Sequence, residues 1–220
     1  MKITDKIVTS LLAFCVLPVA IFFPLIRVLY QINGWEIFQN MVDIPNAVEN
    51  DTGLTEDSFS IWFVFKNFFS GGLSMSGFDF SNVDDSVKAV LPYLIAAGIL
   101  FALGVVIGIA LFIVNVATKA KKTQCIISAV GIIDLSICGI LFSKVAKPIV
   151  DGSISVGTLL SSVLGSGGES NFGKVLATSL ISIKELNLTS AWSIMILIFA
   201  VIIIWNVSYM LTRDEVKGGK

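Results

Sequence analysis

The sequence has 220 residues, of which 55% are hydrophobic and 14% charged, and its formal net charge is −1. Soluble domains are usually about 45–50% apolar and about 25% charged. Together with a mean hydropathy of +0.89, this composition excludes an ordinary soluble domain and indicates a polytopic membrane protein. The chain has no histidine, which excludes histidine-bound zinc and histidine-ligated haem. We expect no metal and no cofactor.

The first predicted span covers residues 7–30, an apolar run interrupted only by Arg27. No small-x-small cleavage site follows this run, so we expect a retained span rather than a removed signal peptide. Pro18 and Pro24 fall inside it. Each proline removes a backbone donor and displaces the carbonyl four residues earlier, so we predict that both kink the first helix.

An acidic outer loop is predicted over residues 31–88, and its segment 58–69 is dense in aromatic side chains. Twelve residues are too few to cross a bilayer as a helix. One interpretation is an element that packs at the membrane interface or within the loop. The other is an exposed patch that binds a partner protein. The candidate patch residues are Trp62, Phe63, Phe65, Phe68 and Phe69.

Two further spans, residues 89–117 and 124–143, are predicted to form a hairpin joined by a basic turn at residues 118–123. Residues 89–116 contain no charge in 28 positions, which is about 42 Å of helix and exceeds the roughly 30 Å of hydrocarbon in a bilayer. Small residues allow membrane helices to approach closely. The glycines that we expect at these helix contacts are Gly98, Gly104, Gly108, Gly131 and Gly139.

A second outer loop is predicted over residues 144–190, followed by a fourth span over residues 191–211. Within the loop, apolar residues at positions 176, 180, 183 and 186 predict a short amphipathic helix over residues 174–187. Because both outer loops contain such ordered segments, we expect them to form a cap over the outer ends of the spans.

The charges are divided unevenly between the two predicted sides of the membrane. The short segments before the first span, between spans two and three, and after span four hold eight basic and three acidic residues. The outer loops and outer span ends hold seven basic and twelve acidic residues. We expect the protein to lie in the cell membrane. By the positive-inside rule, both termini and the 118–123 turn should then face the cytoplasm.

Asp134 is the one charged residue deep inside a predicted span. It lies eleven residues beyond Thr123, about 16 Å along the helix and close to mid-membrane. An ionised carboxylate there costs roughly 2.5–3.5 kcal/mol on insertion scales. We therefore expect Asp134 to be buried and protonated, and to donate a hydrogen bond to the Phe14 carbonyl or to the hydroxyl of Ser128 or Ser136. A proton or cation site remains the alternative.

These predictions together describe an all-α integral membrane protein, a four-transmembrane-helix bundle with two ordered extracytoplasmic loops forming a cap. The layout is similar in topology to that of the claudin group. The first loop contains Trp35 and Trp62 but no cysteine, so the cysteine-containing loop signature of that group is missing and no residue role is carried over.

Two functions follow from this layout. The first is a non-enzymatic membrane scaffold, adhesion protein or accessory subunit that binds a protein partner, or a second copy of itself, through the outer loops. The second is an oligomeric channel or transporter component in which Asp134 lines a proton or cation path. Without histidine, a Ser/His/Asp or Cys/His catalytic set cannot form, and the basic turn is too small to bind nucleic acid. We expect no enzymatic activity.

Overall fold

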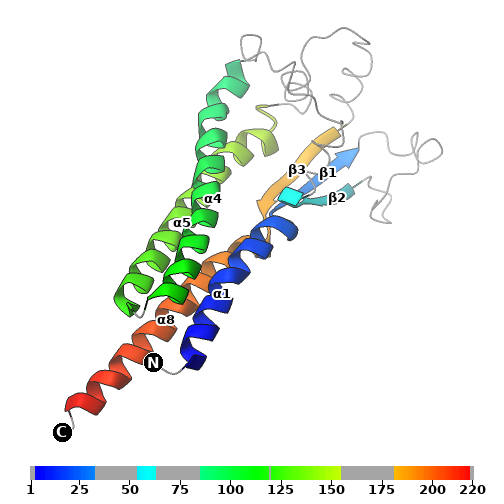
Figure 1. Cartoon of the computed structure of the whole chain (residues 1–220). Helices are drawn as coiled ribbons and strands as arrows, with labels where there is room; N and C mark the ends of the chain where they lie inside the picture. The colour runs from blue at the N-terminus through cyan, green and yellow to red at the C-terminus, as the bar shows by residue number, and fades with distance from the viewer. Residues whose placement is uncertain (1–2, 33–53, 63–84, 119, 155–180, 219–220) are drawn as a thin grey trace. The chain divides into compact units, whose positions relative to one another are not determined.

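The computed structural model describes residues 3–32, 54–62, 85–118, 120–154 and 181–218. Across these ranges the chain forms four helices and three strands, in the order α1, β1, β2, α4, α5, β3 and α8 (Figure 1). The prediction of a mostly helical protein is confirmed. The expectation of an all-α fold is too narrow, because the three strands form an antiparallel sheet.

Three helices in these ranges are long and apolar enough to cross a membrane: α4 (Asp85–Ala117), α5 (Lys121–Val150) and α8 (Ser190–Gly218). Their outward faces carry large apolar side chains, and Ile99, Ile126 and Ile204 are 63–64% exposed. Apolar surface of this kind is unfavourable in water and suits contact with lipid tails. The chain is a multi-pass membrane protein.

The first helix is shorter than the sequence predicts. Helix α1 (Ile3–Phe22) contains an apolar stretch from Lys6 to Phe22 and ends two residues before Pro24. Proline disfavours helical geometry in the residue before it and has no N–H to continue the helix. Pro18 therefore lies inside the helix, whereas Pro24 lies beyond its end and does not kink it. Residues 26–32, predicted to complete the first span, form strand β1 (Ile26–Ile32) instead.

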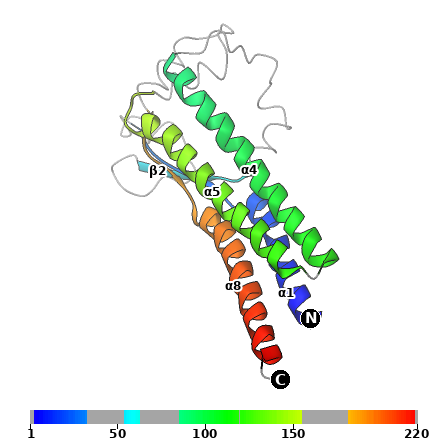
Figure 2. The ribbon, with the colours of Figure 1, turned by 90° about the vertical axis from the view of Figure 1, so that its left-hand side faces the viewer.

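The chain divides into two compact units. The helical unit contains α1, residues 96–140 of α4 and α5, and α8; the sheet unit contains residues 24–95 and 141–189. Within the helical unit the four helices run side by side and alternate in direction (Figures 1 and 2). The N-terminal end of α1, the α4–α5 turn and the C-terminal end of α8 lie at one end of this unit (Figure 1).

All four helices contribute to the core of the helical unit. Its largest fully buried apolar side chains are Val16 on α1, Leu111 on α4, Leu135 on α5, and Met195, Phe199 and Ile202 on α8. Three of the predicted contact glycines lie where these helices meet. A Cβ at Gly104 would come within 2.8 Å of Leu135, one at Gly108 within 2.9 Å of Val16, and one at Gly131 within 2.9 Å of the Phe199 ring.

The other two predicted contact glycines lie elsewhere. Gly98 is exposed, and a Cβ built on it would meet no atom within 4 Å. The expectation that it forms a helix contact is therefore wrong. Gly139 is partly exposed on α5. Small residues that are close in sequence thus occupy different faces of one helix, and only those that face a neighbouring helix permit close approach.

The sheet joins three segments that are far apart in the sequence. Its order is β2–β1–β3, with β1 in the centre between β2 (Leu54–Phe59) and β3 (Ile181–Leu188), and both pairings are antiparallel. In register, Val28 lies opposite Asp57 on one side and Leu186 on the other. The predicted amphipathic helix over residues 174–187 is wrong for residues 181–187, which belong to β3.

Backbone hydrogen bonds continue the sheet beyond the ends of its strands, at Leu25 before β1 and Thr189 after β3. The Leu25 N–H donates to the Phe59 carbonyl at 2.8 Å, and the Thr189 N–H donates to the Leu25 carbonyl at 3.0 Å. The Thr189 hydroxyl donates to the Pro24 carbonyl. These bonds hold the residues that follow α1 against the residue that precedes α8. A small apolar cluster of Val87, Val90, Ile149 and Ile154 also belongs to the sheet unit.

Candidate functional site

Helix α5 carries a row of buried polar side chains inside the helical unit. We call it the α5 polar row, and its members are Lys121, Gln124, Ser128, Asp134 and Cys138. The steps of three and four residues place Lys121, Gln124 and Ser128 on one side of the helix, and the six-residue step to Asp134 places Asp134 and Cys138 about 120° further around it. From Lys121 to Cys138 the row rises about 26 Å along the helix. The row is thus nearly as long as the hydrocarbon layer is thick.

At the end of the row near the α4–α5 turn, Lys121 reaches across to α8. Its ammonium donates to Asn206 Oδ1 at 2.8 Å and lies 5.5 Å from the centre of the Tyr209 ring. Only 6% of Lys121 is exposed, and Asn206 is fully buried. An amide oxygen and an aromatic face both stabilise a cation that has left water. From the sequence, Lys121 was expected only as part of the basic turn at residues 118–123.

A second polar contact at the same end joins α4 to α1. The Asn115 amide donates to the Thr9 carbonyl at 2.9 Å, and both residues are fully buried. Neither residue was predicted from the sequence to have a role. Asn115 and Asn206 could have been found as polar residues near the ends of otherwise uninterrupted apolar runs, where a neighbouring helix must satisfy them.

Asp134 is 6% exposed and points toward α4. Its Oδ2 lies 3.0 Å from the position that a Cβ of Gly104 would occupy, so the carboxyl group fits because that residue is glycine. Within the part of the chain that the structure describes, Oδ2 has no hydrogen-bond partner. The Cys138 thiol, one turn further along α5, donates to the Ala97 carbonyl of α4 at 3.0 Å.

Neither predicted serine partner makes a hydrogen bond to Asp134 among the described residues. Ser128 is buried, but its hydroxyl has no partner among the described residues. Ser136 is exposed, not buried as expected, and donates to the Ile132 carbonyl of its own helix at 2.7 Å. A position two residues from Asp134 lies about 200° around the helix, which explains why Ser136 faces outward.

Several other buried polar atoms, like Asp134 Oδ2, have no hydrogen-bond partner among the described residues. In the described ranges, the Asn115 Oδ1, both polar atoms of the Gln124 amide, and the Asn206 Nδ2 are buried without a hydrogen-bond partner in the chain. A buried polar atom left without a partner costs about 1–3 kcal/mol. These polar atoms lie on α4, α5 and α8, so the polar character of the interior is not confined to one helix.

The sheet presents a second polar surface, on the face that carries Arg27. This guanidinium lies between two carboxylates on the flanking strands, 3.3 Å from Glu56 on β2 and 3.7 Å from Glu185 on β3. All three side chains are 45–49% exposed. The three strands thus bring one cation and two carboxylates onto an accessible surface, which we call the charged sheet face.

On the opposite face of the sheet, the Tyr30 hydroxyl donates to Asp57 Oδ2 at 3.0 Å. Partial burial raises the pKa of Tyr30 above its ordinary value, and the hydrogen bond and the negative charge of Asp57 add to this effect. The contact links β1 to β2 by side chains as well as by backbone hydrogen bonds.

Of the predicted aromatic patch, the structure describes only Trp62, which is 50% exposed. Phe63, Phe65, Phe68 and Phe69 lie outside the described residues. Among the residues that are described, no group of three or more histidine, cysteine, aspartate or glutamate side chains is placed to hold a metal ion. Comparison with protein-family models, curated proteins and solved structures found no match to this chain.

Proposed function

We propose that this protein is a non-enzymatic scaffold, adhesion protein or accessory subunit of the cell membrane, which binds a partner through its extracytoplasmic sheet. The observation that carries the proposal is the β2–β1–β3 pairing. Strand β1 begins four residues after α1, and β3 ends two residues before α8. Segments from both predicted outer loops therefore share one sheet, as expected of a folded cap that presents a fixed surface.

In the proposed orientation of the protein in the membrane, both termini and the 118–123 turn lie in the cytoplasm. The excess of basic residues in those segments supports it. The common location of the two helix termini and the α4–α5 turn at one end of the helical unit also supports it (Figure 1). The sheet segments connect to the opposite ends of α1 and α8 along the chain, so they belong outside the cell in this topology.

The charged sheet face is the surface on which we expect a partner to bind. Exposed ion pairs contribute only about 0–1 kcal/mol to stability, so Arg27, Glu56 and Glu185 are better suited to recognition than to holding the sheet together. Charges at the rim of an interface steer association and select among partners. A partner with complementary basic groups fits the two carboxylates.

The test is purification of the full chain from its native membrane, followed by identification of the proteins that co-purify. The double variant Glu56→Gln, Glu185→Gln should recover the partner about fivefold less efficiently, because both carboxylate charges are lost. Asp85→Asn is the matched control, since Asp85 is an exposed acid outside the sheet, and it should recover the partner normally. Equal recovery with the double variant and the wild type would contradict the proposal.

A second candidate function is a proton or cation path through the helical unit. The observation that favours it is the buried Asp134 carboxyl group, whose Oδ2 has no partner in the described chain. Ionisable groups inside a membrane commonly mark such paths. In proteoliposomes, wild-type protein would then carry a proton or cation flux that Asp134→Asn abolishes without changing the unfolding temperature. Absence of flux through the wild-type protein eliminates this candidate.

A further inference from the structure

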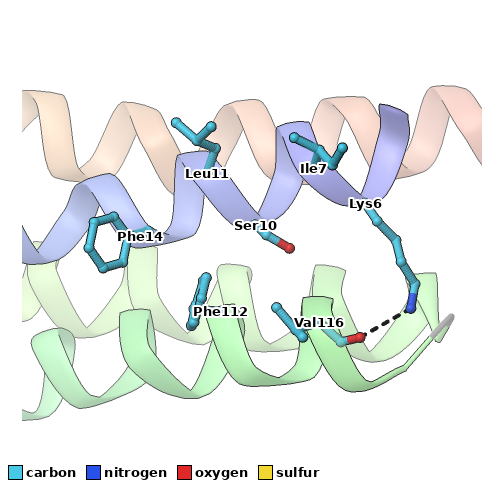
Figure 3. Close-up of a pocket in the computed structure, with 7 residues that line it drawn as sticks. All are labelled: Lys6, Ile7, Ser10, Leu11, Phe14, Phe112 and Val116. Carbon is cyan, nitrogen blue, oxygen red and sulfur yellow. Dashed lines mark hydrogen bonds between the residues drawn. The ribbon is translucent and has the colours of Figure 1, made fainter. Parts of the chain in front are cut away.

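A groove of about 550 Å³ runs along the surface of the helical unit between α1 and α4 (Figure 3). Its apolar walls come from α1 through Ile7, Leu11 and Phe14, and from α4 through Phe112 and Val116. The side chains of Ile7, Leu11, Phe14 and Val116 are 54–59% exposed, so the groove opens outward rather than into the core. Both helices are strongly apolar here, which suits contact with lipid tails.

One end of the groove carries a cation. The Lys6 ammonium donates to the Val116 carbonyl at 3.1 Å, in the last turn of α4 (Figure 3). Lys6 remains partly exposed, and an ammonium has three donors, of which this bond uses one. Because Val116 lies in the last turn of α4, this bond places Lys6 beside the α4–α5 turn.

The opposite end of the groove is aromatic. Phe14 and Phe112 lie with ring centres 5.7 Å apart and their planes inclined by 55°, an edge-oriented arrangement that aromatic pairs favour. From Lys6 to Phe14 the groove extends about 12 Å along α1. Over this length the lining changes from the Lys6 ammonium, past the Ser10 hydroxyl, to the two phenylalanine rings.

We propose that this groove binds an anionic phospholipid, with an acyl chain against Leu11, Phe14 and Phe112 and the headgroup phosphate beside Lys6. The polarity of the groove matches that of a lipid: one ionic end at headgroup depth and one apolar end. A neighbouring transmembrane helix would fill the apolar part but has no use for a cation there. A lysine near the membrane surface contributes about 1 kcal/mol to the binding of anionic lipid. This inference does not depend on the proposed function.

The experiment measures lipid affinity from the rise in the unfolding temperature of the full chain in detergent. The lipid added is phosphatidylglycerol or phosphatidylcholine of identical acyl chains. The wild-type protein should bind phosphatidylglycerol about fivefold more tightly, the ratio that corresponds to about 1 kcal/mol. Lys6→Gln should abolish this preference, and Lys6→Arg should retain it. Lys122→Gln, which removes an exposed lysine at the same end but outside the groove, should also retain it. Glycerophosphate, which lacks acyl chains, should raise the unfolding temperature of none of these proteins.

A second variant tests the apolar part without changing charge. Leu11→Trp places a larger ring in the groove at a position that is already 59% exposed, so folding should be unaffected and phosphatidylglycerol binding should weaken at least fivefold. The proposal is overturned if Lys6→Gln keeps the preference for phosphatidylglycerol, if Leu11→Trp binds that lipid as tightly as the wild type, or if Leu11→Trp converts a dimer to a monomer. The last result would identify the groove as a contact between two copies.

Discussion

Gly131 is a position on α5 that has little room for a side chain. A Cβ there would lie 2.9–3.1 Å from three atoms of the Phe199 ring, and Phe199 is fully buried. A ring has no flexible end that can move aside, so added volume forces a shift of the helices, which typically costs about 1–3 kcal/mol. The contact between α5 and α8 therefore depends on this position remaining glycine.

We predict that Gly131→Ala is less stable than Gly98→Ala by about 1–3 kcal/mol. Both variants gain the same helix propensity, which cancels in the comparison, but the new methyl group of Gly98→Ala meets no atom within 4 Å. Unfolding midpoints of the two variants in detergent measure the difference. Equal midpoints would show that α5 and α8 are not as close as the structure places them.

Tyr30 provides a prediction about pH. Its pKa is raised above 10.0 by burial and by Asp57, so the folded protein holds the proton more tightly than the unfolded chain. The corresponding stability is fully present below the ordinary pKa of tyrosine and is lost as the pH rises through the raised value. Tyr30→Phe should be less stable at neutral pH and should lose less stability between neutral pH and about pH 11. Unfolding midpoints over that range test this, and parallel curves would contradict it.

The residues of the helical interior were predictable only in part. A lone aspartate in an apolar run indicates burial, and the structure places Asp134 inside. The residues that it faces depend on the rotation of each helix about its axis, which a short list of serines does not determine. The sequence gives little indication of three other buried polar residues, because each is a single uncharged residue near the end of a span: Gln124, Asn115 and Asn206. Their shared location becomes evident only when the helices are assembled.

At the scale of elements, long apolar runs predict helices well, but the sequence of the segments between them indicates strands less clearly. Ile26–Tyr30 was included in the first span because it is apolar, yet Pro24 ends the helix before it. In β3, isoleucines at positions 181 and 183 alternate with Ser182 and Lys184, a strand pattern. A register shift in the β1–β3 pairing interrupts this alternation, so the spacing also resembled that of a helix.

The strand register predicts a specific crosslink. With the native cysteines replaced by alanine, Val28→Cys combined with Leu186→Cys should form a disulfide under mild oxidation, because these positions are opposite each other in β1 and β3. Directly paired Cα atoms in antiparallel strands lie about 4.5–5.5 Å apart, within disulfide range. Val28→Cys with Asn187→Cys is the control, since Asn187 faces the other side of the sheet. Equal crosslinking of both pairs, or none in the first, would refute this register.

At the scale of the whole molecule, composition and run length were enough to predict a multi-pass membrane protein with mostly helical structure. They could not predict that α1 is followed directly by a strand that pairs with segments from both predicted outer loops. Pairing between residues about 150–160 positions apart leaves no periodic signal in either segment. The proposed function depends on this connection, because the sheet combines the two loops in one surface.

The central claim is that the sheet and the basic turn lie on opposite sides of the membrane. The most direct test uses two proteins without native cysteines, one with Ser58→Cys in β2 and one with Thr123→Cys near the start of α5, both at exposed positions. A thiol reagent that does not cross membranes is added to intact cells. The account predicts that the cysteine at position 58 is labelled and that the one at position 123 reacts only after the cells are opened. Labelling of both cysteines in intact cells would contradict it.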